Sequence, residues 1–97
     1  MVTDEGSSLK GARTPRRAAD VRLRIVGNRN LLLKVQVTME INDIGMQIWK
    51  LCDGQHSEED IAFALTQSYE VDHAMALNDI SRFLNEMVNA YMIEWRD

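Results

Sequence analysis

The feature that most constrains the fold is a change in hydrophobic period at residue 41. Before that point, apolar and polar residues alternate, most clearly between Val21 and Ile25, which is typical of a half-buried strand. From Ile41 to Cys52, apolar residues instead recur at spacings of three and four, which favours a helix with one buried face. Because the strands come before the helices, the sequence predicts an α+β fold.

Three strands are expected, over residues 21–25, 31–35 and 37–41. Residues 27–30 read Gly-Asn-Arg-Asn, and Gly and Asn tolerate the positive φ angles of a hairpin turn. The second and third strands are separated only by Gln36, so a tight turn or bulge is expected there. These three segments predict a three-stranded antiparallel sheet.

Two helices are expected after the sheet. Asn42 is a good N-cap for the first helix, and Gly54 suits the left-handed residue that follows a helix end. Ser57 precedes the second helix and lies three residues before Asp60, which is the spacing of a capping box.

A third helix, the longest, is expected from about His73 to Ala90, with Asp72 as its N-cap. Residues 92–95 follow as a short extended segment. Three strands and then three helices, with a very short break between the last two, predict a winged helix-turn-helix-like arrangement. Its small core is expected to include Trp49, Phe63 and Phe83.

The charges are divided unevenly along the chain. Residues 1–30 carry seven Lys or Arg and three acids, whereas residues 31–97 carry four Lys or Arg and twelve acids, for a net charge of −4. Residues 1–20 have several charges and no apolar period, so a flexible basic N-terminal tail is expected there. Residues 21–97 are then the folded domain.

Length and composition exclude several classes of protein. Ninety-seven residues suffice for one domain and leave little room for an enclosed catalytic cavity. No apolar run approaches the roughly 20 residues that cross a bilayer. The single cysteine, Cys52, cannot form an internal disulfide, so the reducing cytoplasm is the expected compartment.

Candidate catalytic and metal-binding groups are few. Cys52, Asp53 and His56 are close in sequence, but a metal site would need a fourth ligand and would take Cys52 out of its apolar stripe. A buried, inert Cys52 is the favoured interpretation. The glycines are scattered and form no phosphate-binding loop. No catalytic residue, metal or cofactor is therefore expected, and the chain is not predicted to be an enzyme.

The segment 41–54, which reads INDIGMQIWKLCDG, resembles the first-helix signature of the PqqD family. These small peptide-binding domains are the recognition elements for precursors of ribosomally made, modified peptides. The matching residues are Asn42, Gly45, Ile48, Trp49, Leu51, Asp53 and Gly54. Ser57–Asp72 and Asp79–Met87 resemble the second and third helices of the family. The departures are Tyr91-Met92-Ile93, where the family has Gly-Leu, and the basic N-terminal segment.

The resemblance implies the same fold and a noncatalytic role. Such a domain binds the leader segment of a precursor peptide and presents it to a modifying enzyme, such as a radical SAM enzyme, a leader peptidase or a cyclase. In the family the leader adds as a strand beside the third strand and packs against the third helix. The residues expected to bind it here are Val35, Gln36, Val37, Thr38, Met39, Glu40, Asp79, Arg82, Phe83, Glu86 and Met87.

The sequence leaves several alternatives open. Arg82 either pairs with a leader carboxylate or balances Asp79 or Glu86, and the alternation alone does not show which side of the third strand faces inward. A winged-helix DNA-binding regulator is the main alternative function, but the acidic body and a third helix with one cation disfavour it. A structural adaptor for an enzyme is a third, weaker alternative function. The expected partners are a precursor peptide and its modifying enzyme, without nucleic acid or membrane, and the expected state is a monomer or weak homodimer.

Overall fold

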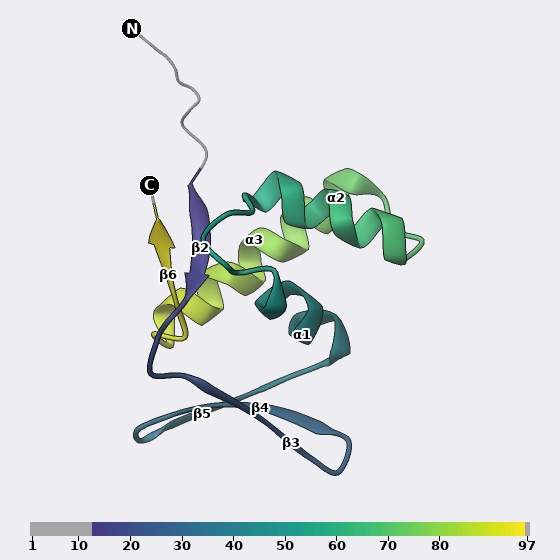
Figure 1. Cartoon of the computed structure of the whole chain (residues 1–97). Coiled ribbons are helices and arrows are strands. Elements are labelled where there is room, and N and C mark those ends of the chain that lie inside the picture. Colours follow the sequence, from purple (N-terminus) through teal and green to yellow (C-terminus); the bar gives the residue numbers. More distant parts are fainter. Residues whose placement is uncertain (1–12, 97) are drawn as a thin grey trace, which may run out of the picture.

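The computed structural model describes residues 13–96. A three-stranded antiparallel sheet lies across one side of the molecule, and three helices gather on the other (Figure 1). The sheet consists of β3 (Arg22–Val26), β4 (Arg29–Lys34) and β5 (Val37–Ile41), in that spatial order. The alternation in sequence therefore predicted the sheet correctly, with the strand ends shifted by one or two residues.

The three helices are α1 (Asp43–Lys50), α2 (Glu58–Ser68) and α3 (His73–Asn89). Their N-terminal caps are the ones that the sequence predicted. The Asn42 side chain accepts a hydrogen bond from the backbone of Gly45, and Asp72 caps α3 in the same way. Ser57 and Asp60 form a complete capping box at the start of α2. These caps satisfy backbone N–H groups that a helix leaves without partners.

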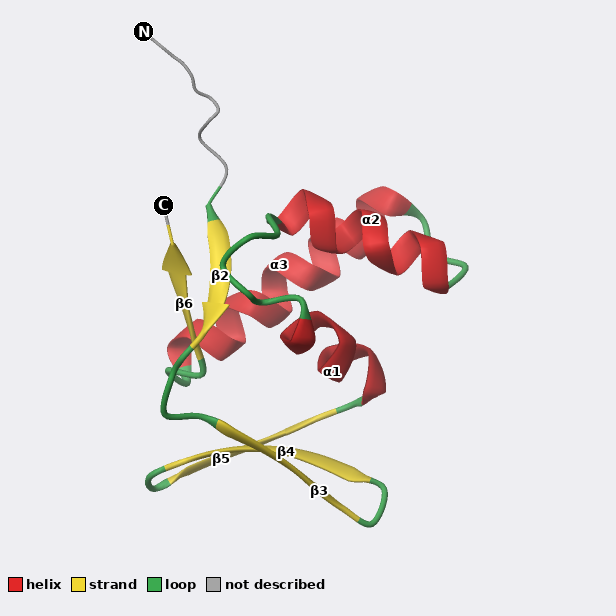
Figure 2. Ribbon diagram, in the orientation of Figure 1, coloured by secondary structure: helices red, strands yellow, loops and turns green. Residues whose placement is uncertain are grey.

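A second, two-stranded sheet corrects the prediction of a flexible tail over residues 1–20. β2 (Thr14–Arg17) pairs antiparallel with β6 (Ile93–Arg96), the last element of the chain (Figure 2). Pro15 is fully buried, and the backbone N–H of Arg17 donates to the carbonyl of Cys52. The tail prediction is wrong for residues 14–17, because a polar strand can be held by backbone pairing to a distant segment. Residues 1–12 lie outside the described part of the chain.

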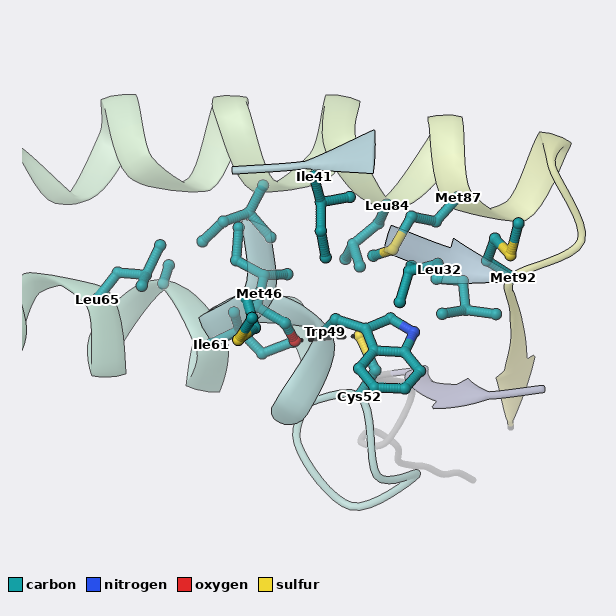
Figure 3. Close-up of a cluster of buried hydrophobic side chains, with 14 of the residues drawn as sticks. Leu32, Ile41, Met46, Trp49, Cys52, Ile61, Leu65, Leu84, Met87 and Met92 are labelled. Carbon is teal, nitrogen blue, oxygen red and sulfur yellow. Dashed lines mark hydrogen bonds between the residues drawn. The ribbon is translucent and has the colours of Figure 1, made fainter. Parts of the chain in front are cut away.

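The hydrophobic core lies between the three-stranded sheet and the helices (Figure 3). Leu32 of β4 is completely buried, as are Ile80 and Leu84 of α3. Trp49 is buried, as predicted. Phe63 is 60% exposed on α2, so its assignment to the core is wrong. Its neighbours Ile61, Ala62 and Leu65 fill the inner face of that helix.

Candidate functional site

β5 is an edge strand. It is hydrogen-bonded to β4 on one side, and no other strand of residues 13–96 pairs with its second side. An edge strand presents backbone N–H and C=O groups that can pair with another chain. The structure therefore has a place where an extended peptide can extend the sheet.

The register of the hairpin shows which backbone groups point outward. Lys34 pairs with Val37 across a two-residue loop, so the backbone groups of this pair bond to each other. Bonded and non-bonded pairs alternate along antiparallel strands. The N–H and C=O groups of Thr38 and Glu40 therefore point away from β4, toward the unpaired edge.

The side chains of β5 divide between two faces. Met39 lies opposite the buried Leu32 in the register, which places Met39 on the core side of the sheet together with Val37 and Ile41. These side chains are half-buried or buried, whereas Thr38 and Glu40 are exposed. The inward face, which the sequence left open, is therefore the one that carries Val37, Met39 and Ile41.

Val35 and Gln36 form the turn between β4 and β5, so the predicted edge strand is shorter than expected. The side chain of Val35 is 85% exposed. Gln36 has a φ of 65°, a left-handed conformation that is uncommon for residues other than glycine. Neither residue lies within the paired part of β5. An added strand would thus meet them only at its end.

The exposed surface of α3 supplies the polar residues of the candidate site. Arg82 forms an ion pair with Asp79 at 2.9 Å, and both side chains are at least 60% exposed. Arg82 thus balances the charge of Asp79, which is one of the two roles that the sequence leaves open. An exposed pair of this kind contributes only about 0–1 kcal/mol to stability. Glu86 is exposed one turn further along.

Phe83 connects α3 to the start of α1. Its half-buried ring packs so closely against Gly45 that a Cβ added to Gly45 would lie 2.9 Å from Phe83 Cζ. The same Cβ would lie 3.2 Å from Asn42 Oδ1 and from Ile41 Cβ. A glycine at this position is therefore what allows Phe83 to lie beside the end of β5.

Met87 does not belong to this surface. Its side chain is completely buried in the core (Figure 3), so it cannot contact a peptide at the surface of α3. Its assignment as a peptide-binding residue is wrong. Met87 lies one turn after Phe83 on α3, and the sequence alone does not show where the buried stripe of a helix ends and its exposed flank begins.

At the far end of α3, the backbone is held against β4. Lys34 Nζ donates to the carbonyl of Tyr91 at 2.9 Å and lies 3.4 Å from an oxygen of Asp20. Tyr91 has a φ of 61°, a conformation in which glycine is favoured after a helix. Tyr91 thus adopts a left-handed conformation although it carries a side chain.

The groups with catalytic potential are held in structural contacts. Cys52 is fully buried, and burial raises the pKa of its thiol to about 12, so the reactive thiolate is suppressed. The Asp53 carboxylate accepts hydrogen bonds from the backbones of Gln55 and His56 and lies 2.9 Å from the ring of His56. Burial acts in the opposite direction, but these bonds prevail and lower the pKa of Asp53.

No cluster of three or more His, Cys, Asp or Glu side chains with the geometry of a metal site occurs among residues 13–96. The candidate made of Cys52, Asp53 and His56 fails because the thiol of Cys52 points into the core and donates to the carbonyl of Ile48. In the same part of the chain, no helix is long and apolar enough to cross a bilayer.

A pocket that the sequence did not reveal lies between the helices. It is lined by side chains of α1, α2, the segment that joins α2 to α3, and the first half of α3, among them Ile44, Ile48, Tyr69 and Met75. Asp79 also lines it, which makes the pocket a neighbour of the polar residues described above. No single helix contributes enough of the lining to show the pocket as a sequence pattern.

Comparison with known proteins identifies relatives of this chain. The sequence profile of the family described as coenzyme PQQ synthesis protein D (PqqD) matches residues 30–93. The bifunctional coenzyme PQQ synthesis protein C/D of Methylorubrum extorquens is 32% identical over 95 residues, which are 96% of this chain and 26% of that protein. The chain thus spans about a quarter of the length of this curated relative.

Two solved structures share the fold. The solution NMR structure of the PqqD truncation of Methylobacterium extorquens PqqCD, described as a functional, stand-alone recognition element, has a TM-score of 0.72 at 32% identity. The match covers 82% of this chain and 87% of that one. Lasso peptide synthetase B1 complexed with the leader peptide has a TM-score of 0.73 at 23% identity, over 82% of this chain and 96% of that one. The predicted α+β fold is thereby confirmed.

Proposed function

The chain belongs to the PqqD family, and from that premise we propose that it binds the leader segment of a ribosomally synthesised precursor peptide. In this role it holds the peptide for a separate modifying enzyme, such as a radical SAM enzyme, a leader peptidase or a cyclase. It acts in the cytoplasm and catalyses no reaction itself. The observation that carries the proposal is the unpaired edge of β5 next to the exposed surface of α3.

The edge supplies the backbone part of recognition. Thr38 and Glu40 each direct one N–H and one C=O group toward an incoming strand. A typical hydrogen bond contributes about 0.5–1.5 kcal/mol net, so these groups together contribute about 2–6 kcal/mol. Association costs about 4–15 kcal/mol in lost freedom. Backbone pairing alone is therefore too weak, and side-chain contacts must decide which peptide binds.

The geometry of the edge predicts which face of the sheet each side chain of the bound peptide contacts. A peptide residue bonded to Thr38 or Glu40 directs its side chain to the outer, solvated face of the sheet. The residue between them, opposite Met39, points to the core side, because neighbouring residues alternate. There it meets the half-buried side chain of Met39, on the side of the sheet where Phe83 lies beside the end of β5. An apolar leader residue is expected at this position.

Charge supplies a further contribution on α3. Arg82 and Asp79 pair at the surface, and a leader carboxylate can compete with Asp79 for the guanidinium. The same surface disfavours the alternative of a DNA-binding regulator. A recognition helix needs cations for phosphates and bases, whereas the one Arg of α3 is paired and Glu86 lies one turn away.

The proposal is tested by titrating the protein with the synthetic leader encoded by a short open reading frame beside its gene. Calorimetry is expected to give a dissociation constant of about 1 µM or tighter, as suits a small strand-addition interface. The same peptide with its residues in reversed order is the control for nonspecific binding. If none of the neighbouring peptides binds and duplex DNA binds in a salt-dependent manner, the DNA-binding function takes the place of this proposal.

Presentation to an enzyme needs a second assay. The modifying enzyme encoded nearby is incubated with the full precursor, with and without this protein, and the product is measured by mass spectrometry. Added protein is expected to accelerate modification of the full precursor and to leave a leaderless precursor unaffected. An equal effect on both substrates would contradict the proposed role.

A further inference from the structure

The pocket between the helices lies directly beyond the Ile41 end of β5, the strand proposed to pair with the leader. Ile41 is the last residue of β5, and only two residues separate it from Ile44, which lines the pocket from α1. On α3, Asp79 lines the pocket one turn before Phe83. Residues four apart on a helix are surface neighbours. The edge, Phe83 and the pocket thus form one continuous path over the start of α1.

The lining of the pocket is almost entirely apolar. Asp79 is the one charged residue among the nine that line it, and its carboxylate is already paired with Arg82. The rim exposes large apolar side chains to water: Ile44 and Val71 are each 42% exposed, and Met75 is 64% exposed. Exposed apolar side chains gathered around a hollow mark a surface that a partner covers.

The direction of an added strand decides which part of a peptide reaches this pocket. In an antiparallel addition to β5, the peptide's N-terminal end lies at the Ile41 end of the strand. Each extended residue advances about 3.3 Å. The residues immediately before the paired segment therefore pass over Asn42 and the first turn of α1, toward Ile44 and Met75.

We propose that this pocket is a second recognition subsite, which takes a large apolar side chain of the peptide from a position N-terminal to its strand-forming segment. The inference rests on the proposed function, since it assumes an antiparallel peptide on β5. It adds a requirement on the substrate: an aliphatic or aromatic residue before the paired segment. An acidic side chain is excluded there by the lack of polar partners and by Asp79.

The test uses a phage-displayed library of random 16-residue peptides, selected on the immobilised chain of 97 residues. The selected peptides are expected to combine an alternating β-strand pattern with one large apolar residue at a constant spacing before it. The same selection is carried out on the variant Met75→Asp. The third position of a helix accommodates an acid well, and Met75 is largely exposed, so this variant is expected to fold.

The matched control is Phe63→Asp, which makes the same kind of change on α2 at a side chain that is 60% exposed and does not line the pocket. One selected peptide is then titrated into all three proteins. Met75→Asp is expected to weaken its binding about ten- to a hundredfold, as expected for an apolar side chain that loses its pocket. Phe63→Asp is expected to leave the affinity unchanged.

The possible outcomes distinguish the two claims. If the selected peptides keep the strand pattern but lack the apolar residue, or if they bind Met75→Asp as tightly as the original protein, the pocket is not a subsite and the proposed function stands. If no peptide is selected on the original protein, both claims fail. Methyl NMR signals of Ile44 and Met75 give an independent readout, since they are expected to shift when the peptide binds.

Discussion

The two outer strands of the three-stranded sheet offer similar backbone groups in different surroundings. On β3, Val26 pairs with Arg29 across a two-residue loop, so by the same alternation the N–H and C=O groups of Leu23 and Ile25 point to the unpaired side. Thr38 and Glu40 occupy the corresponding positions on β5. If an unpaired edge were sufficient for binding, both strands would be sites.

What distinguishes the two edges is the surface beside them. β5 runs directly into α1 and adjoins Phe83, so an added strand there buries side chains against existing apolar surface. β3 is exposed at four of its five residues, and Ile25 is 60% exposed. Arg22 and Arg24 also have no ion-pair partner among residues 13–96. Exposed cations along an edge oppose pairing with a second copy of it.

The largest expected effect comes from blocking each edge in turn with proline. Thr38→Pro removes an outward N–H group of β5 without removing a hydrogen bond to β4. It is expected to weaken leader binding about a hundredfold, because the added strand loses its register as well as one bond. Ile25→Pro makes the equivalent change on β3 and is expected to leave the affinity unchanged. Calorimetric titration of both variants measures the difference.

Equal losses in the two proline variants would show that the edges do not differ in function. Thr38→Val, which keeps the N–H group, is the control for the lost hydroxyl. Far-ultraviolet circular dichroism of each variant confirms that the sheet and helices have formed.

The second effect concerns the close packing of α1 against Phe83. Gly45→Ala places a methyl group 2.9 Å from Phe83 Cζ. Overpacking costs about 1–3 kcal/mol, while alanine gains about 1 kcal/mol in helix propensity. The free energy of unfolding is thus expected to fall by about 1 kcal/mol, and leader affinity is expected to fall as the ring moves. Urea denaturation and titration measure the two quantities.

A glycine near the other edge provides the comparison. Gly27 has a φ of 62°, with nothing within 4 Å of an added Cβ, so Gly27→Ala is expected to reduce stability through backbone strain alone and to leave binding intact. Combining Gly45→Ala with Phe83→Leu should recover stability. A double variant as unstable as Gly45→Ala would show that Phe83 is not the group that clashes.

A smaller effect is expected from charge reversal. Arg82→Glu places two acids side by side on α3 and removes the cation available to a leader carboxylate. Leader affinity is expected to fall about three- to fivefold, the range of one exposed ion pair, without loss of stability. Arg22→Glu on β3 is the matched control and should not affect binding. Titrating the leader into both variants at two salt concentrations measures their affinities. Equal losses of affinity in Arg82→Glu and Arg22→Glu would contradict the placement of the site.

The smallest effect on binding is expected at Asp53, whose backbone forms a bridge to Arg16 of β2 and not to the three-stranded sheet. Because hydrogen bonds lower the pKa of Asp53 in the folded protein, the carboxylate stabilises the fold at pH values above its unfolded pKa of about 4. That contribution disappears as the pH falls through the folded pKa. Asp53→Asn is therefore expected to be less stable at pH 7 and to lose less stability on acidification. Thermal unfolding between pH 2 and 7 tests this expectation. The leader affinity of Asp53→Asn at pH 7 is expected to equal that of the original protein.

Local signals in the sequence predicted the elements that depend on neighbouring residues. The alternation in β3–β5 and the caps at Asn42, Ser57 and Asp72 act within a few positions, and each was confirmed. The strand β2 was missed because its partner β6 lies at the other end of the chain, and its own residues carry no apolar period. Backbone pairing over such a distance leaves no trace in local composition.

The candidate site was predicted only in outline. Resemblance to the family indicated a strand and a helix, and the structure adds which side of each is exposed. Met87 and Phe83 lie one turn apart on α3, yet one is buried in the core and the other borders the surface. The pocket could not be foreseen, because residues of three helices line it and the packing angles between helices bring them together.

The central claim, that β5 and not β3 receives the peptide, is tested most directly by amide hydrogen exchange measured by NMR with and without the leader. The amides of Thr38 and Glu40 are expected to exchange much more slowly once the peptide is bound, because each N–H then donates to the added strand. The amides of Leu23 and Ile25 are expected to exchange at unchanged rates. Protection of Leu23 and Ile25 with none at Thr38 and Glu40 would contradict the account.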